Sequence, residues 1–132
     1  GAHMQHPAIS GGAIFVEPSG YELATGKRLP LRMGGRQGCS TRAAAAGALI
    51  YRGEARRISM WDTTTGKTSS WVNLRPSCWL SVIPAGGMVL VPEGGAGCSC
   101  GNWLETSMGF SPRPKPPEKP KIQPAPAKKE GK

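Results

Sequence analysis

Short apolar runs led by glycine recur along the chain, separated by stretches rich in Gly, Pro, Thr and Ser. Three of these runs lie at positions 12–16, 47–51 and 87–91. Runs of this length, with β-branched or aromatic side chains and turn-forming residues at their ends, are typical of buried strands. The pattern therefore predicts an all-β fold of short strands.

A turn motif repeats between these runs. The segment YELATGK at 21–27 returns as WDTTTGK at 61–67. In both copies we expect the aromatic residue to end a strand and pack inward, and the acid to accept hydrogen bonds from backbone N–H groups at the turn. Glycine then supplies the positive φ that closes the turn, and the next strand begins after the lysine.

Together the two motifs define a unit of several short antiparallel strands, present two to three times at nearly regular intervals. A repeat of about 40 residues with several short strands is typical of a propeller blade. A coincidental pair of hairpins in a small β-sandwich is the alternative. Residues 42–49 contain four consecutive alanines, which favour a short helix, but the segment has no polar face and Gly47 interrupts it.

The chain divides into three parts. Residues 1–4 resemble a cleavage and cloning scar, so we expect the natural protein to begin upstream. Residues 5–110 form the predicted β-repeat domain. Residues 111–132 hold seven prolines, seven Lys or Arg, two Glu and one sizeable apolar side chain, Ile122. Because this segment cannot bury enough apolar surface to offset its chain entropy, it predicts a disordered Pro/Lys-rich tail.

The net charge of +9 lies disproportionately on that tail. A basic arm is suited to anionic surfaces, and a solvated linker that aids solubility is the alternative. Aromatic residues do not interleave the tail lysines, which argues against a nucleic-acid partner. No apolar run approaches the ~18 residues that a membrane span needs, so none is predicted.

Several groups of residues carry a family resemblance. The turns at 21–27 and 61–67 resemble those of bacterial PQQ-like β-propeller repeats, over roughly residues 11 to 75. The words GCST at 38–41, RPSCW at 75–79, IPAGG at 83–87 and GCSC at 97–100, with Pro92-Glu93, resemble the C-terminal end of large secreted or envelope-associated propellers. The resemblance implies a fold, shared by quinone-dependent dehydrogenases and by scaffolds without a cofactor. No quinone or calcium site carries over, and no cofactor is predicted.

The cysteines allow three interpretations. An even count in a Gly-rich, β-rich, exported chain favours two disulfides, and a bridge within Cys-x-Cys would close a strained ring. We therefore expect the two distant cysteines to pair with the Cys-x-Cys pair, in either order. A thiolate metal site and free thiols are the alternatives, although the spacing lacks paired Cys-x-x-Cys knuckles. The residues concerned are Cys39, Cys78, Cys98 and Cys100.

Catalytic groups are scarce. His3 lies in the scar and His6 just beyond it, which leaves the domain without a histidine as general base. The arginines of GGR at 34–36 and RR at 56–57 are expected to be solvated loop charges, with an anion site as the alternative. The sequence thus points away from an enzyme and names no catalytic residue. The acids are Glu17, Glu22, Glu54, Asp62, Glu93 and Glu105, two of which belong to the repeated turns.

Four residues are candidates for ligand contact. Trp61 and Trp71 occupy strand positions and are expected in the core, whereas Trp103, after a Gly-Asn pair, is the tryptophan most suited to exposure and ring stacking. Trp79 follows a cysteine and is equally suited to packing on a disulfide. Glu93 and Arg75 complete the set, and a hydrogen bond from Glu93 to loop backbone is its alternative role.

The sequence therefore predicts a non-catalytic scaffold or binding module of an extracytoplasmic propeller-type protein, located in the periplasm, the cell envelope or outside the cell. Its expected partners are a protein, a polysaccharide or further copies of itself. One alternative is a small metal- or redox-active domain built on the four cysteines. Another is a fragment of a quinone-dependent enzyme whose active site lies upstream.

Overall fold

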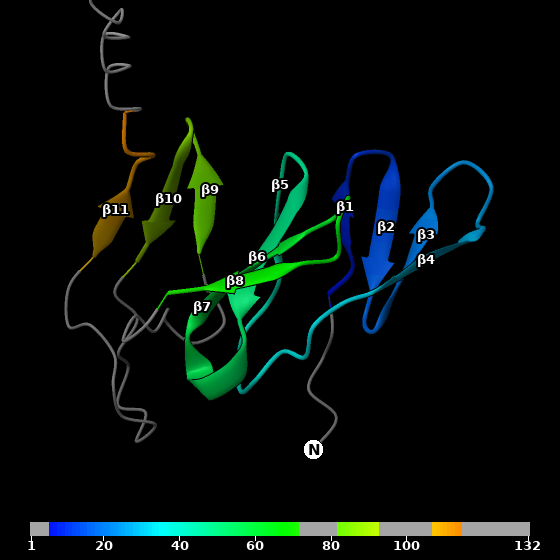
Figure 1. Cartoon of the computed structure of the whole chain (residues 1–132), viewed down its shortest axis with the longest axis horizontal. Helices are drawn as coiled ribbons and strands as arrows, with labels where there is room; N and C mark the ends of the chain where they lie inside the picture. Colours follow the sequence, from blue (N-terminus) through cyan, green and yellow to red (C-terminus); the bar gives the residue numbers. More distant parts are fainter. Residues whose placement is uncertain (1–5, 72–81, 93–106, 115–132) are drawn as a thin grey trace, which may run out of the picture.

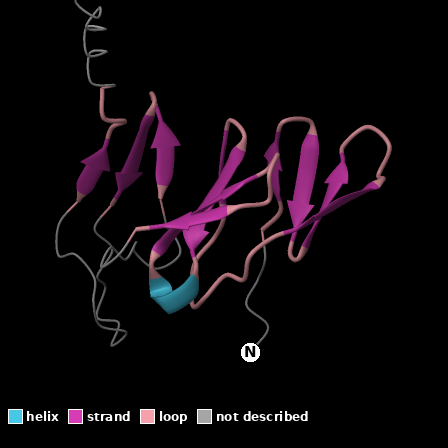
Figure 2. Ribbon diagram, viewed as in Figure 1, coloured by secondary structure: helices cyan, strands magenta, loops and turns pink. Residues whose placement is uncertain are grey.

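The computed structural model describes residues 6–71, 82–92 and 107–114. Apart from one 3-10 turn at Glu54–Arg56, the regular structure in these residues is β. The strands form three small antiparallel sheets that follow one another along the molecule (Figure 1, Figure 2). The predicted all-β fold of short antiparallel strands is confirmed. Residues 1–5 and 115–132, with the predicted scar and most of the predicted tail, lie outside the described residues.

Strand order within the sheets is simple. The N-terminal sheet consists of β1 (Ala8–Ser10), β2 (Ala13–Val16), β3 (Ser19–Glu22) and β4 (Arg28–Arg32), in that spatial order. The middle sheet has the same order with β5 (Ala43–Ala45), β6 (Ala48–Arg52), β7 (Ile58–Asp62) and β8 (Thr68–Ser70). In the C-terminal sheet, β10 (Met88–Val91) lies between β9 (Ile83–Ala85) and β11 (Met108–Phe110).

Each sheet opens with a hairpin of the same kind. Two residues join the strands, and in the first and third hairpins both are glycines with positive φ, 57° and 74° in each case. Such a turn requires left-handed backbone at both positions, which glycine adopts without steric cost. In the middle hairpin Ala45 pairs with Ala48, so the alanine run forms a strand and a turn, not a helix.

The repeated turns share their backbone hydrogen bonds. The Gly26 N–H donates to the Glu22 carbonyl and the Gly66 N–H donates to the Asp62 carbonyl, both at 2.9 Å. The side chains differ. Asp62 Oδ1 accepts from the N–H groups of two threonines at 2.8 Å, whereas the longer Glu22 side chain accepts from the Thr25 hydroxyl at 2.7 Å.

Two apolar clusters lie between the sheets. In the first, Phe15 of the N-terminal sheet meets Trp61 of the middle sheet edge to face, with ring centroids 5.7 Å apart. Trp61 is 1% exposed, which confirms its predicted place in the core. In the second cluster, Ile50 and Ile58 of the middle sheet pack with Val91 of the C-terminal sheet, and Trp71 lies against them.

The first strands of successive sheets lie next to one another. β1 contacts β5, and β5 contacts β9 (Figure 1). The Ser10 hydroxyl donates to the Ala45 carbonyl at 2.7 Å and so links β1 to β5 directly. The sheets therefore share an inner side formed by β1, β5 and β9, while β4 and β8 form outer edges.

Candidate functional site

Most of the predicted site residues lie outside the described part of the chain. They are Arg75, Cys78, Trp79, Glu93, Cys98, Cys100 and Trp103. The remaining one, Cys39, lies half-buried in the 33–42 segment that joins the first two sheets, and its thiol is free with respect to the described residues. Disulfide pairing, thiolate metal binding and ligand contact by these residues therefore stay predictions.

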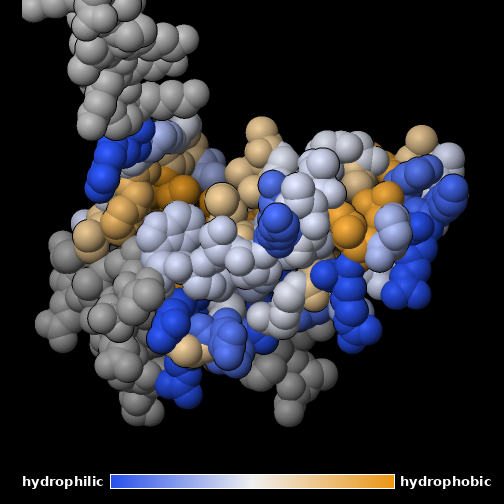
Figure 3. All heavy atoms as spheres, viewed as in Figure 1, coloured by the Kyte–Doolittle hydropathy of each residue, from blue (hydrophilic) through white to orange (hydrophobic). Residues whose placement is uncertain are grey.

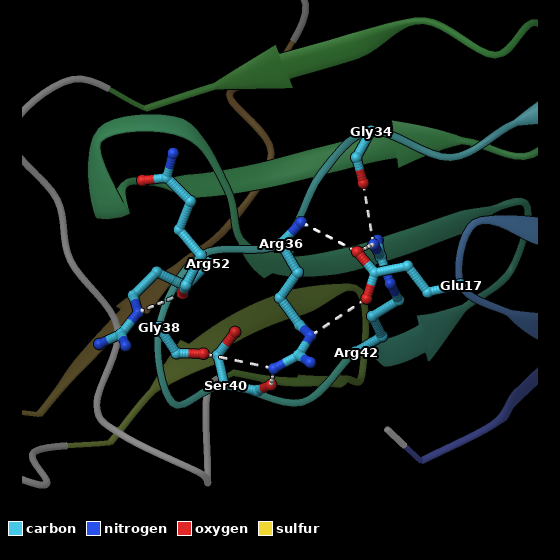
Figure 4. A network of polar contacts seen from close by, with 8 residues as sticks. Glu17, Gly34, Arg36, Gly38, Ser40, Arg42 and Arg52 are labelled. Carbon is cyan, nitrogen blue, oxygen red and sulfur yellow. Dashed lines mark hydrogen bonds and ion pairs between the residues drawn. The ribbon is translucent and has the colours of Figure 1, made fainter. Parts of the chain in front are cut away.

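A polar network occupies the same 33–42 segment (Figure 4). Its centre is Glu17, from the turn between β2 and β3. The Arg36 backbone N–H donates to Glu17 Oε1 at 3.2 Å, and its guanidinium Nε lies 3.4 Å from Oε2. The Arg42 Nη2 atom lies 3.0 Å from Oε1 and donates to the Gly34 carbonyl at 2.8 Å. One carboxylate thus holds two guanidinium groups.

Arg42 is the more enclosed of the two arginines that contact Glu17. Its side chain is 4% exposed, and its guanidinium lies over the Tyr51 ring, 4.1 Å from the ring centroid. Tyr51 belongs to β6, so this cation–π contact joins the 33–42 segment to the middle sheet. Arg52, also from β6, donates from Nε to the Gln37 carbonyl at 3.0 Å. The network therefore spans the junction between the first two sheets.

The charge state of Glu17 fits this arrangement. Burial by itself raises the pKa of the Glu17 carboxyl. The hydrogen bonds from Arg36 and the positive charges of Arg42 and Arg36 together lower this pKa by more, so that it lies below its ordinary value. Glu17 is consequently ionised at neutral pH, and its role is that of a counter-ion. A general acid at that pH would need the opposite shift of its pKa.

The sequence interpretation of Arg36 as a solvated loop charge is wrong, because its side chain is 8% exposed and bound on both sides. Besides Glu17, the Arg36 guanidinium donates to the carbonyls of Gly38 and Ser40. The sequence gives only a weak signal for this pairing of Arg36 with Glu17, because two strands, β3 and β4, lie between the two residues in the chain. The network closes one sheet onto the next.

Exposed apolar surface on the first and last sheets of the array is a second feature of the structure. Each sheet has two faces, which can be compared at equivalent positions of β2, β6 and β10. The forward face is the side that bears Phe15 in β2, Ile50 in β6 and Leu90 in β10. The back face is the opposite side, which bears Val16, Tyr51 and Val91 at the next position. Because strand side chains alternate between faces, each inner strand contributes to both. In Figure 3, apolar surface gathers over β9–β11 at one end and over β2–β4 at the other.

Burial follows the position of a sheet in the array. At the forward position, Phe15 and Ile50 are buried, whereas Leu90 of the C-terminal sheet is 36% exposed. At the back position, Tyr51 and Val91 are buried, whereas Val16 of the N-terminal sheet is 42% exposed. The residue exposed in each set of three is the one at the free end of the array.

Neighbouring residues extend both end faces. Ile9, opposite Ile14 in the register of β1 and β2, is 58% exposed on the back face of the N-terminal sheet. Met88 and Leu90 share the forward face of the C-terminal sheet, because a Cβ at Gly109 would meet both of them. Ile83, which pairs with Leu90, is 49% exposed beside them. These are apolar surfaces of the kind that mark interaction sites.

Among residues 6–71, 82–92 and 107–114, no three His, Cys, Asp or Glu side chains come together as metal ligands. The described part of the chain also has no helix with the length and apolarity to cross a bilayer.

Comparison with protein-family models, with curated proteins and with solved structures gave no match. The features of this chain that bear on its function are the repeated sheets, the charged junction and the two exposed end faces.

Proposed function

We propose that this chain is a non-catalytic scaffold module of an extracytoplasmic propeller-type protein. Its two end faces, in this proposal, receive further β-sheets. The observation that carries the proposal is that each exposed end face uses the same sequence positions as a face buried inside the array. A sheet of the same kind is therefore the natural complement of either end.

Strand connectivity supports the same proposal. Consecutive strands run from an inner edge to an outer edge in the first two sheets, and the inner strands of all three sheets lie next to one another. A propeller blade has this up-and-down order, with its first strand near the central axis. The Glu17 network adds rigidity at the first junction, as a scaffold requires.

An apolar reporter dye tests this function. The proposal predicts that the dye binds the dilute protein at its end faces, and that the double substitution V16E/L90E removes most of the fluorescence. L23E is the matched control, because Leu23 is 54% exposed but lies in the turn after β3, outside the strands that bear Val16 and Leu90. Equal dye binding by the double variant and the wild type would contradict the proposal.

Native intact mass separates the scaffold from the metal- or redox-active alternative. Two disulfides lower the mass of the unreduced protein by about 4 Da relative to the reduced form, since each thiol loses one hydrogen. That result supports an exported structural module. A stoichiometric metal adduct that is lost on acidification would instead make the cysteines the functional site.

A further inference from the structure

Exposed cations line the outermost strand of the N-terminal sheet. Along β4 the side chains alternate, so that Arg28, Pro30 and Arg32 are exposed while the two leucines between them pack against the first apolar cluster. Lys27 is exposed directly before the strand. Neither arginine forms an ion pair with the described part of the chain, in which the salt bridges involve Glu17. We call Lys27, Arg28 and Arg32 the basic strip.

The fold does not require the arginines of this strip. In the middle sheet β8 takes the place of β4, because its register on β7 matches that of β4 on β3. Thr68 of β8 stands at the place of Arg28. Ser70 stands at the place of Arg32, so β8 forms an outer edge with uncharged residues. Charges that only protect an edge strand from unwanted pairing would be expected on both strands, and edge protection alone therefore does not explain the strip.

Cover on the back face leaves the strip accessible. The N-terminal sheet covers the back face of the middle sheet, where Trp61 is 1% exposed. Thr68 and Ser70 lie on the same face and are nevertheless exposed. The longer arginine side chains at these places of the N-terminal sheet therefore reach solvent whether or not another sheet covers that face. The strip is a binding surface separate from the two end faces.

We infer that the basic strip binds a linear anionic polysaccharide that carries carboxylate groups. Arg28 and Arg32 are four residues apart on one face of a strand, a separation on the order of 10 Å that suits two acidic groups of one polymer better than one small anion. A guanidinium group donates two parallel hydrogen bonds to a carboxylate, which adds geometry to the attraction between the charges. The inference goes beyond the proposed function, because it does not depend on what covers the end faces.

Other anionic partners fit the strip less well. Pro30 has no N–H group, which disfavours the addition of a strand along this edge. A protein interface has an apolar centre, whereas a proline stands between the two arginines and the exposed apolar residues of this face lie on β1 and β2. A lipid surface would use a large apolar anchor at the same place. Single-stranded nucleic acid stacks on several aromatic rings, and Tyr21 is the one aromatic residue that pairs with β4.

Isothermal titration of the full chain with polygalacturonate, a linear polyuronate, tests the inference. The wild type is expected to bind at low ionic strength and more weakly as salt is added, because exposed charges are screened. R28Q/R32Q is expected to lower the affinity by about tenfold. R57Q/R113Q is the matched control, since it removes the same charge from exposed residues outside the strip and leaves the basic residues after position 114 in place. R28K/R32K keeps the charge but loses the planar fork, and an intermediate affinity is expected.

Three results would overturn the inference. One is the absence of polygalacturonate binding by the wild type at low ionic strength. Another is a loss in R57Q/R113Q as large as that in R28Q/R32Q, since the charge of the whole chain would then carry the binding. A third is tighter binding of poly-L-glutamate, poly(dT) or phosphatidylglycerol vesicles than of polygalacturonate, which would assign the strip to another class of partner. Dextran, a neutral polysaccharide, is expected not to bind.

Thermal unfolding of each variant checks that the fold is retained, and R28K/R32K carries the test if the glutamine variant does not fold. The dye assay with V16E/L90E reports on the end faces and is independent of these charges. Failure of the dye assay together with strip-dependent polygalacturonate binding would remove the scaffold function and leave this inference standing.

Discussion

At the scale of single residues, Glu17 is the side chain whose contacts matter most for joining the first two sheets. Two guanidinium groups, whose side chains are 8% and 4% exposed, depend on its carboxylate. Its partners, Arg36 and Arg42, lie in the segment after β4, so that β3 and β4 separate them from Glu17 in the chain. Their spacing in the sequence therefore follows no strand or helix period. The turn acids were predictable because Glu22 and Asp62 bond within their own turns.

We expect E17Q to lower the free energy of unfolding by about 2 kcal/mol at neutral pH, because the amide leaves two buried cations without a counter-charge. Urea denaturation measures the loss. E54Q is the control, since Glu54 is exposed, and its stability is expected to equal that of the wild type. Equal stability of E17Q and the wild type would contradict a counter-ion role.

The same pair of proteins gives a pH dependence. The pKa of Glu17 is lowered in the folded state, so its stabilisation is fully present above the unfolded pKa of about 4.5 and is lost as the pH falls through the folded pKa. The stability difference between wild type and E17Q is therefore expected to be constant near neutrality and to shrink in acid. A difference that grows below pH 4 would show that the sign is wrong.

At the scale of elements, the sequence predicted the strands and turns better than the hairpins that open each sheet. The apolar runs became β2, β6 and β10, and the two Thr-Gly turns share their backbone bonds. The preceding strands β1, β5 and β9 were missed. Each is too short to show a period of two, and Gly-Gly or Ala-Gly was the remaining signal for a two-residue turn.

Glycine substitutions in the repeated turns separate backbone strain from packing. Gly26 and Gly66 have φ of 70° and 71°, so alanine at either position costs about 1–2 kcal/mol. G66A is expected to cost more, because its Cβ would lie 3.2 Å from Leu31 Cδ2, whereas nothing lies within 4 Å at Gly26. Thermal unfolding checks the order, with G35A as a control that is expected to be nearly neutral.

At the scale of the whole molecule, equivalent residues have unequal roles because their sheets have different neighbours. Tyr21 and Trp61 occupy the same place in the repeated turn, and both were expected to pack inward. Trp61 is buried between two sheets, whereas Tyr21 lies half-buried on the free back face of the N-terminal sheet. The inward prediction was wrong for Tyr21, since this sheet has no neighbour on that side in the described part of the single chain.

This difference in burial predicts different losses of stability when the two aromatic residues are replaced. W61A is expected to destabilise the fold by about 3–5 kcal/mol at any protein concentration, because it leaves a cavity between sheets. Y21A is expected to cost about 1 kcal/mol in the dilute protein. Thermal unfolding measures both losses, and a loss in Y21A as large as that in W61A would contradict the smaller contribution of Tyr21.

The sequence by itself determined what depends on neighbours along the chain. Apolar runs, turn glycines and short-range side-chain bonds specified the strands, the Thr-Gly turns and the all-β class, because each involves only a few consecutive residues. Tertiary structure decided which face of each strand is buried, which charges meet at Glu17, and which apolar residues stay exposed at Val16 and Leu90. Those outcomes depend on whether another sheet stands opposite, and a local pattern that repeats three times is the same whether or not its face is covered.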